Sequence, residues 1–198
     1  MHLLFVCTGN ICRSPLAEGL ALAYARAENE ALGAALTASS AGTAALVGHP
    51  IQSSAGLVLR GLGGDADGFR ARQLLAEQIQ TADLVLTMTR RHRAAVLELA
   101  PRMMSRTFTL REAASLLAAM DSTWLTNVPD VTVRGRQLVA ALAQLRAARV
   151  VNRNALRDDI ADPIGKNLDT FQRVGDAIST ALLPLLDALA GKPKATSG

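Results

Sequence analysis

Several residue types are scarce in this chain of 198 residues. Aromatic side chains make up 3% of it, and it has only two cysteines, Cys7 and Cys12, and three scattered histidines. Two cysteines exclude the disulfide framework of a small secreted protein. Because histidine and cysteine are so few, a zinc site is not expected either, and the sequence predicts no metal and no cofactor. Leu, Val, Ile and Ala must fill the core.

Long apolar runs and blocks of one charge are also missing. The run "LLFV" near the start is short and has no basic region before it, so we expect neither a membrane helix nor a secretory signal, and a cytoplasmic protein. The 21 Lys and Arg residues are mixed with 17 Asp and Glu, for a net charge of +4. This mixture argues against a nucleic-acid partner and fits a protein that attracts small or protein-borne anions.

Short β-type runs alternate with segments of helical period along the chain. The expected strands are 3–6, 36–41, 83–88 and 105–110, and the expected helices are 15–29, 51–62, 90–99, 111–120, 135–149 and 167–190. Pro184 should kink the last helix or end it early. The alternation indicates an α/β fold with parallel strands and crossover helices. We expect one domain over 1–190 and a disordered tail over 191–198.

The stretch "FVCTGNICRSPLAEGL", residues 5–20, joins the first expected strand to the first expected helix. Such a tight loop gathers unpaired backbone N–H groups at a positive helix end, and therefore binds a tetrahedral oxyanion. Gly9 lets the backbone turn without a Cβ clash, and Asn10 tolerates a left-handed conformation. Arg13 supplies a planar fork that matches two phosphate oxygens. The phosphate-binding residues are thus predicted to be Thr8, Gly9, Asn10, Ile11, Cys12 and Arg13.

Cys7 supplies a nucleophile at the same place. A thiol at a helix N-terminus beside a guanidinium is expected to be deprotonated at neutral pH. Ser14 can donate a hydrogen bond to the thiolate and help it to leave later. A lone cysteine at a strand end more often only packs there, but the ordered set around Cys7 favours attack on a bound phosphate ester.

The motif "VCTGNICRSPLAE" resembles the phosphate loop of the low-molecular-weight protein tyrosine phosphatases, in which Cys is followed by five residues and then by Arg and Ser. Further matches follow in the order that the family shows: "SAGT" at 40–43, "GHP" at 48–50, "FRARQL" at 69–74, "ADLVLTMTRRHRAAVL" at 82–97 and "DDIADP" at 158–163. The resemblance covers most of the chain and is weakest over 112–157. It implies a four-stranded parallel sheet with helices on both faces, a doubly wound fold.

The resemblance also implies the residue that the loop lacks. Expelling the leaving group needs a proton donor, and in the family this is the aspartate of an Asp-Pro pair, here Asp162 with Pro163. The implied mechanism is attack by Cys7, protonation of the leaving oxygen by Asp162, and hydrolysis of a phosphocysteine with phosphotyrosine proteins as substrates and inorganic phosphate as product. From the residues alone, Asp158, Asp159 and Asp162 all remain candidates, since aspartates before a proline are usually turn formers.

Cys12 is the second cysteine of the loop, five residues after Cys7. The family is known for a pair of loop cysteines of which one forms a disulfide with the nucleophile and protects it from over-oxidation. Cys12 is the redox partner that this resemblance implies. A small buried side chain under the loop is an equally good interpretation.

The chain departs from the family pattern at two places and matches its tyrosine-directed members at a third. Family members usually carry an aromatic wall residue after the Asp-Pro pair, where this chain has Ile164, and losing ring stacking would loosen tyrosine preference. Ile11 matches tyrosine-directed members, whereas phosphoarginine phosphatases carry threonine there. The chain also has an insert at about 112–157, with Leu138, Leu142 and Leu145 on one helix face and basic residues mostly on the others: Arg134, Arg136, Arg146, Arg149, Arg153 and Arg157. We expect this insert to be a solvated amphipathic helix packed on the core, or else a docking surface for an acidic partner.

Two other functions stay open. Arsenate reductases share this loop, and one that draws on a small external thiol would need only Cys7; the thioredoxin-coupled kind needs cysteines beyond Cys12, and the chain has none. A non-catalytic phosphate-binding or phosphoprotein-binding module is the other alternative. Such a module would be expected to have lost the nucleophile or the acid, and Cys7 and Asp162 are both present.

Overall fold

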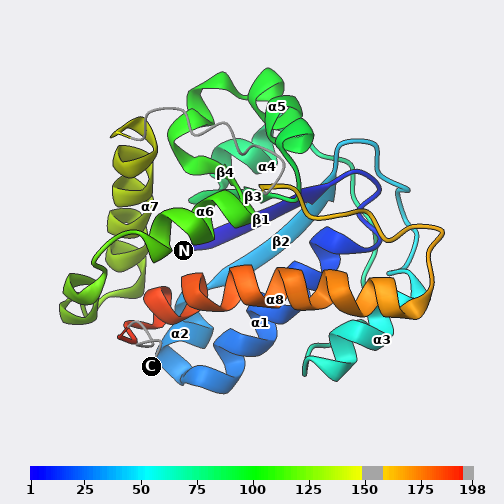
Figure 1. Cartoon of the computed structure of the whole chain (residues 1–198), viewed down its shortest axis with the longest axis horizontal. Coiled ribbons are helices and arrows are strands. Elements are labelled where there is room, and N and C mark those ends of the chain that lie inside the picture. The colour runs from blue at the N-terminus through cyan, green and yellow to red at the C-terminus, as the bar shows by residue number, and fades with distance from the viewer. Residues whose placement is uncertain (149–157, 194–198) are drawn as a thin grey trace.

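The computed structural model describes residues 1–148 and 158–193. Its four strands form one parallel sheet, in the order β2-β1-β3-β4 (Figure 1). The strands are β1 (His2–Cys7), β2 (Thr37–Gly42), β3 (Leu84–Thr87) and β4 (Thr107–Thr109). All four overlap the predicted strands, but β4 is shorter than the predicted 105–110, because residues 105–106 belong to a 3-10 helix and residue 110 begins α6. Because β1 lies between β2 and β3, its carboxyl end at Cys7 lies at an inner position of the sheet edge.

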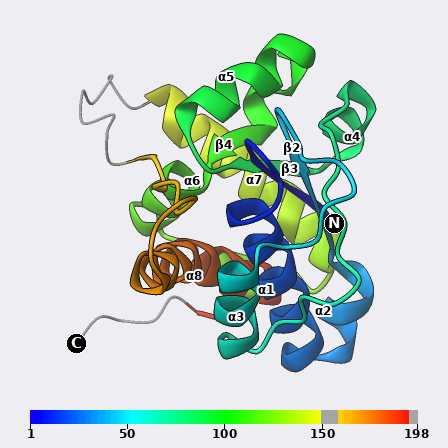
Figure 2. The same cartoon turned by 90° about the vertical axis from the view of Figure 1, so that its right-hand side faces the viewer.

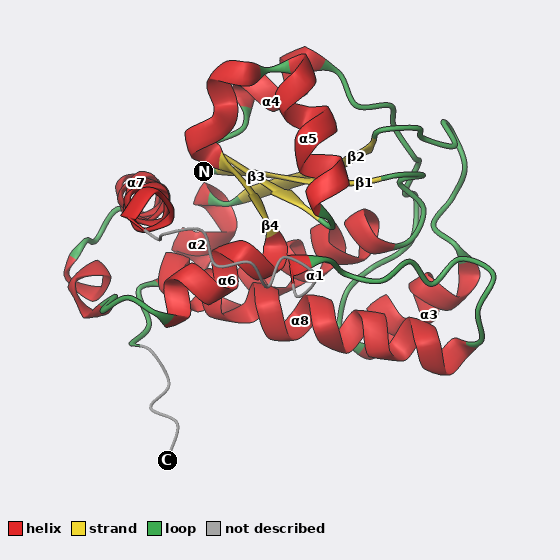
Figure 3. Cartoon of the chain, turned by 45° about the horizontal axis from the view of Figure 1, so that its top comes forward, coloured by secondary structure: helices red, strands yellow, loops and turns green. Residues whose placement is uncertain are grey.

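Helices cover both faces of the sheet, which confirms the predicted doubly wound fold (Figures 2 and 3). On one side lie α1 (Arg13–Glu28), α6 (Leu110–Ala118) and α8 (Leu168–Ala190), with α3 (Ser53–Gly61) packed on α1 and α8. On the other side lie α4 (Ala76–Thr81) and α5 (Arg90–Leu99). Alternate residues of β1 serve the two layers, because Leu3 and Phe5 belong to the first core and Leu4 and Val6 to the second.

Helix boundaries follow the predictions closely, with informative differences. The helix α1 begins at Arg13, two residues earlier than expected, so Arg13 and Ser14 belong to its first turn. The helix α8 continues through Pro184 to Ala190, so the expected early end is wrong. Its apolar face is buried along its whole length, and this packing outweighs the missing N–H of the proline. The short helices α2 (Glu30–Ala35) and α4 were not predicted, because six residues do not define a period.

The insert is helical, as predicted, but its arginines are not all solvated. It contains a 3-10 turn, η2 (Thr123–Asn127), and the helix α7 (Val131–Ala148), whose residues Leu138 and Leu142 join the core. Arg134 is only 6% exposed and donates to carbonyl groups of the loop before α7 and of the last turn of α8. It therefore supplies a donor at the buried C-terminal end of α8, where carbonyl groups lack partners within the helix. Arg149, Arg153 and Arg157 lie outside the described residues.

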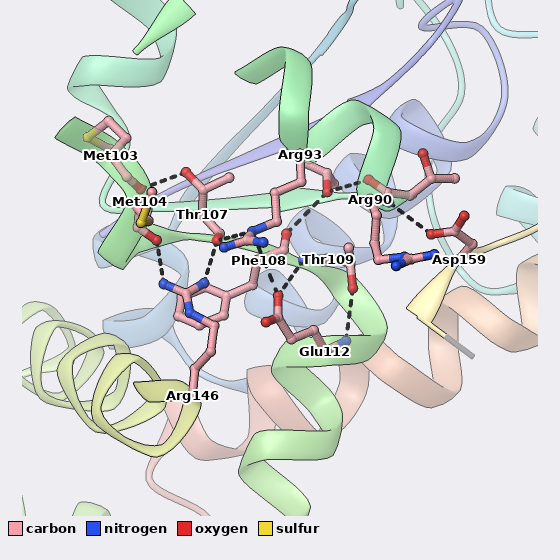
Figure 4. A network of polar contacts seen from close by, with 12 residues as sticks. Arg90, Arg93, Met103, Met104, Thr107, Phe108, Thr109, Glu112, Arg146 and Asp159 are labelled. Atoms are coloured by element: carbon pink, nitrogen blue, oxygen red, sulfur yellow. Dashed lines mark hydrogen bonds and ion pairs between the residues drawn. The ribbon is translucent and has the colours of Figure 1, made fainter. Parts of the chain in front are cut away.

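Arg146 fixes the other end of α7 to the sheet (Figure 4). Its guanidinium donates to the carbonyls of Thr107, at 2.8 Å, and Met104, at 2.5 Å, and lies over the ring of Phe108, 4.2 Å from its centroid. Arg93 of α5 donates to the same Thr107 carbonyl at 3.0 Å. Two arginines from different helices thus meet on strand β4.

The last helix is tied to α1 near its C-terminal end. Gly191 ends α8 in a left-handed conformation, and Lys192 pairs with Glu28 of α1. The rest of the predicted tail, from residue 194, lies outside the described residues. Over 1–148 and 158–193, none of the helices combines the length and apolar character needed to cross a bilayer.

Candidate active site

The loop of residues 8–12 connects β1 to α1 at the carboxyl edge of the sheet. Neighbouring segments bind its carbonyl groups from outside. The segment after β2 donates from Thr43 to Cys7 and from Ala44 to Thr8, and Gln52 donates to Ile11, all at 2.8 to 3.0 Å. The backbone of the loop is therefore fixed through its carbonyl oxygens, which accept hydrogen bonds from the neighbouring segments.

The N–H groups of the same loop remain available. Within the described part of the chain, no N–H of residues 8–12 has a hydrogen-bond acceptor. Successive N–H groups of this kind form a concave anion-binding nest, and the first turn of α1 adds its positive dipole end. Thr8, Gly9, Asn10, Ile11 and Cys12 thus supply backbone donors for a tetrahedral oxyanion.

Asn10 holds the loop in this shape, as the sequence predicted. It is the one non-glycine residue with positive φ in the described chain, at 54°, and it is fully buried. Its Nδ2 donates to Ser14 Oγ at 2.9 Å and to Ser40 Oγ at 2.8 Å, and its Oδ1 accepts from the Arg72 N–H at 2.7 Å. The reason given for Gly9 is wrong, because a Cβ there would make only an ordinary 3.6 Å contact and its φ is not positive.

A glycine outside the loop lies in a more closely packed position than Gly9. Gly42, at the end of β2, pairs with Cys7 across the sheet. A Cβ on Gly42 would lie 2.4 Å from the carbonyl oxygen of Thr8, which is far inside contact distance. The strand can therefore approach the loop only because residue 42 has no side chain.

Cys7 lies at the floor of the nest and is only 2% exposed. Its Sγ is 2.9 Å from Ser14 Oγ. Because Ser14 Oγ already accepts a hydrogen bond from Asn10, its own proton is free to point to the sulfur. The sequence predicted this pairing of Cys7 with Ser14.

Arg13 and Asp162 meet on the open side of the loop. The Arg13 guanidinium is buried, forms an ion pair with the Asp162 carboxylate and donates to the Ile160 carbonyl at 3.1 Å. The Asp162 side chain is 49% exposed and also accepts the Ile164 N–H at 3.2 Å. A carboxyl group from the far end of the chain thus stands beside the residue that would bind phosphate.

Cys12 and the two expected wall residues have different surroundings. Cys12 is buried in a small apolar cluster with Ala55 and Phe171, and burial together with the neighbouring Cys7 raises the pKa of its thiol to about 12. Both cysteines are free thiols. Ile11 packs at the margin of that cluster, and Ile164 is 50% exposed on the turn after Asp162.

His92 was missed by the sequence analysis. It is buried behind the loop, with Nε2 2.9 Å from Thr8 Oγ1 and Nδ1 2.9 Å from Thr89 Oγ1. Burial and, after it, the positive Arg13 lower its pKa to about 4, so the ring is neutral at pH 7. Its position in the sequence could have indicated this, since it lies in the first turn of the helix that follows β3, and β3 is paired with β1.

Within residues 1–148 and 158–193, no three His, Cys, Asp or Glu side chains gather closely enough to hold a metal ion. The positive charge at the loop comes from Arg13 and from the N–H groups. The loop N–H groups, Cys7 and Asp162 thus lie close together, an arrangement that can bind a tetrahedral oxyanion beside a thiol and a carboxyl group.

Comparison with known proteins places this site in a family. Residues 2–115, more than half of the chain, match the model of the low molecular weight phosphotyrosine protein phosphatases. The chain therefore belongs to that family. It is 38% identical over 104 residues to the low molecular weight protein-tyrosine-phosphatase Wzb of Salmonella typhi, an alignment that spans 52% of this chain and 64% of that relative.

Two further relatives are informative. The protein-arginine-phosphatase of Geobacillus stearothermophilus is 39% identical over 114 residues, which are 58% of this chain and 72% of that protein. The crystal structure of the low molecular weight protein tyrosine phosphatase from T. tengcongensis superposes with a TM-score of 0.66 at 28% identity, over 94% of this chain and 98% of that one. The relatives of this chain are thus named for two different phosphorylated amino acids.

Proposed function

We propose that this protein is a metal-independent phosphatase that hydrolyses phosphotyrosine in proteins through a phosphocysteine intermediate. One arrangement carries the proposal. Cys7 Sγ lies in hydrogen-bond contact with Ser14 at the floor of the N–H nest, and the Arg13–Asp162 pair lies at its opening. A phosphate monoester bound to the nest and Arg13 would lie between a nucleophile and an acid.

In the first step the Cys7 thiolate attacks phosphorus while Arg13 and the loop N–H groups bind the equatorial oxygens. The bond from phosphorus to the tyrosine oxygen breaks, and Asp162 transfers its proton to that oxygen. In the second step Asp162 takes a proton from water, which attacks the phosphocysteine. The Cys7 thiolate leaves, stabilised by the Ser14 hydroxyl, and inorganic phosphate is released.

Phosphoarginine is the second candidate substrate, because a relative of 39% identity is named for arginine phosphatase activity. Ile11, whose side chain borders the nest, favours an aryl phosphate, since the phosphoarginine enzymes that this sequence resembles carry threonine there. Exposed Ile164 offers an aliphatic wall in place of an aromatic one. We therefore expect phosphotyrosine to be preferred, with a weaker preference than ring stacking would give.

The test is phosphate release without added metal ions from p-nitrophenyl phosphate, phosphotyrosine and phosphoserine peptides, and phosphoarginine. Wild type should hydrolyse the aryl phosphates, Cys7→Ser should be inactive, and Asp162→Asn should lose most activity on the poorer leaving group. If phosphoarginine were hydrolysed faster than the aryl phosphates, phosphoarginine would be the substrate and not phosphotyrosine. Phosphate binding without release from any substrate would overturn the proposal, and thiol-dependent arsenate reduction would then be measured.

A further inference from the structure

The Asp162 segment, residues 158–163, has anchors of its own besides the Arg13 ion pair. Ile160 is buried, and its N–H donates to the carbonyl of Met88, at the end of β3, at 2.8 Å. Its carbonyl accepts from Arg13 at 3.1 Å. One residue earlier, Asp159 Oδ1 accepts from the backbone N–H of Arg90 at 2.8 Å (Figure 4).

The Asp159 contact falls on the first turn of α5. Thr89 is the N-cap of this helix, and its hydroxyl accepts the N–H of His92 at 3.2 Å. The N–H of Arg90, the first residue of the helix, has no partner within the helix, and the Asp159 carboxylate satisfies it. A negative group is also favoured there by the helix dipole.

The same turn of α5 supports the nucleophile loop. His92 is buried and makes its two ring contacts with Thr89, in the turn itself, and with Thr8, the residue after Cys7. The first turn of α5 is therefore in contact with both halves of the site. Whatever fixes residue 159 to this turn also fixes the distance of Asp162 from the loop.

We propose that Asp159 is a positioning residue for the general acid. By binding the first turn of α5 it holds the segment 158–163 so that the Asp162 carboxyl faces the phosphate-binding loop. This inference rests on the proposed function. Asp159 does not itself transfer a proton, because its contact is with the α5 backbone, whereas Asp162 pairs with Arg13.

The chain offers a matched set of variants. Asp159→Ala removes the acceptor, whereas Asp159→Asn keeps an oxygen that can accept the Arg90 N–H and removes only the charge. Asp158→Ala is the control, because Asp158 is the neighbouring carboxylate and has no hydrogen bond or ion pair with a described residue. Thermal unfolding of each variant reports its stability.

The readout is kcat/KM for phenyl phosphate and for p-nitrophenyl phosphate on the same enzyme sample. Phenolate needs a proton to leave and p-nitrophenolate much less, so a misplaced acid changes the ratio of the two values. The ratio does not depend on how much of a sample is folded. We expect Asp159→Ala to shift it by about five- to tenfold against phenyl phosphate, and Asp159→Asn and Asp158→Ala by less than about twofold.

A double variant completes the test. In an Asp162→Asn background the acid is gone, so adding Asp159→Ala should leave the ratio unchanged. An equal loss on both substrates, a further shift in the double variant, or the same shift in Asp158→Ala would each overturn the positioning role. Failure of the proposed function looks different, because wild type would then release no phosphate, or Asp162→Asn would not discriminate between the two leaving groups.

Discussion

Ser14 Oγ lies 2.9 Å from both Cys7 Sγ and Asn10 Nδ2, so one buried hydroxyl links the nucleophile to the residue that shapes its loop. Ser14 accepts a hydrogen bond in one of these contacts and donates one in the other. Asn10 donates to the oxygen, and this leaves the hydroxyl proton for the sulfur. In the proposed mechanism this proton would stabilise a negative charge on sulfur when the thiolate attacks and again when it leaves.

Replacing Ser14 with alanine should slow hydrolysis of the phosphocysteine more than its formation. A hydrogen bond to a charged group contributes about 1.5–3 kcal/mol, which corresponds to a loss of about 10- to 150-fold in kcat. Rapid mixing with p-nitrophenyl phosphate should then show a larger burst of p-nitrophenol before the steady state. The exposed Ser53→Ala is the control, and an unchanged burst in Ser14→Ala would contradict the role of Ser14 at the leaving sulfur.

Replacing Gly42 with alanine should disturb the loop from behind. The new Cβ would lie 2.4 Å from the Thr8 carbonyl oxygen, so strand or loop must shift. We expect a loss of about 1–3 kcal/mol in the free energy of unfolding in urea, together with weaker competitive inhibition by phosphate.

Gly61→Ala is the matched control, since nothing lies within 4 Å of a Cβ at the end of α3. Its stability should be unchanged or slightly increased. If Gly42→Ala bound phosphate as wild type does, the loop would tolerate more displacement than its carbonyl contacts indicate.

His92 should make stability depend on pH. Its pKa is lowered to about 4 in the folded protein, below the ordinary value of 6.5, because it is buried next to Arg13. Between these values the unfolded chain binds more protons, so the stability is complete above pH 6.5 and falls as the pH drops towards 4, by up to about 3 kcal/mol. Urea unfolding at pH 7 and pH 5 should show a smaller difference for His92→Gln than for wild type; equal differences would contradict this.

Cys12 should determine how the protein recovers from oxidation. Its raised pKa keeps it a neutral thiol, so a Cys7 thiolate would be oxidised first, to a sulfenic acid with which Cys12 could then condense. Mild peroxide should inactivate wild type reversibly, with dithiothreitol restoring activity, and Cys12→Ser irreversibly. Equal recovery of both proteins would assign Cys12 a packing role only.

What the sequence could predict depended on the distance between partners along the chain. Cys7, Arg13 and Ser14 were found because they are close neighbours between a strand and a helix. Asp162 came from family resemblance alone, since three aspartates stood near one proline. His92 was not predicted as a site residue, and Asp159 was considered only as a candidate acid, because their partners lie 84 and 69 positions away. Only the folded sheet brings the ends of β1 and β3 together.

The burial of Arg134 in α7 also depends on partners that are distant along the chain. Helical period predicted the buried Leu138 and Leu142 correctly. It could not predict that Arg134 is buried too, because its partners are carbonyl groups at the end of another helix. Charge alone is a poor guide to exposure where helix ends need donors.

The two arginines that meet at Thr107 have a consequence for the protein in a crowded solution. Strand β4 is the outer strand of the sheet on this side, and an outer strand normally presents free carbonyl groups that a strand from another molecule can bind. At Thr107 that carbonyl is already bound by Arg93 and Arg146, and α7 brings a charged group to the strand. The Thr107 carbonyl is therefore not available to a strand from another molecule, and we expect this to limit sheet extension along the β4 edge.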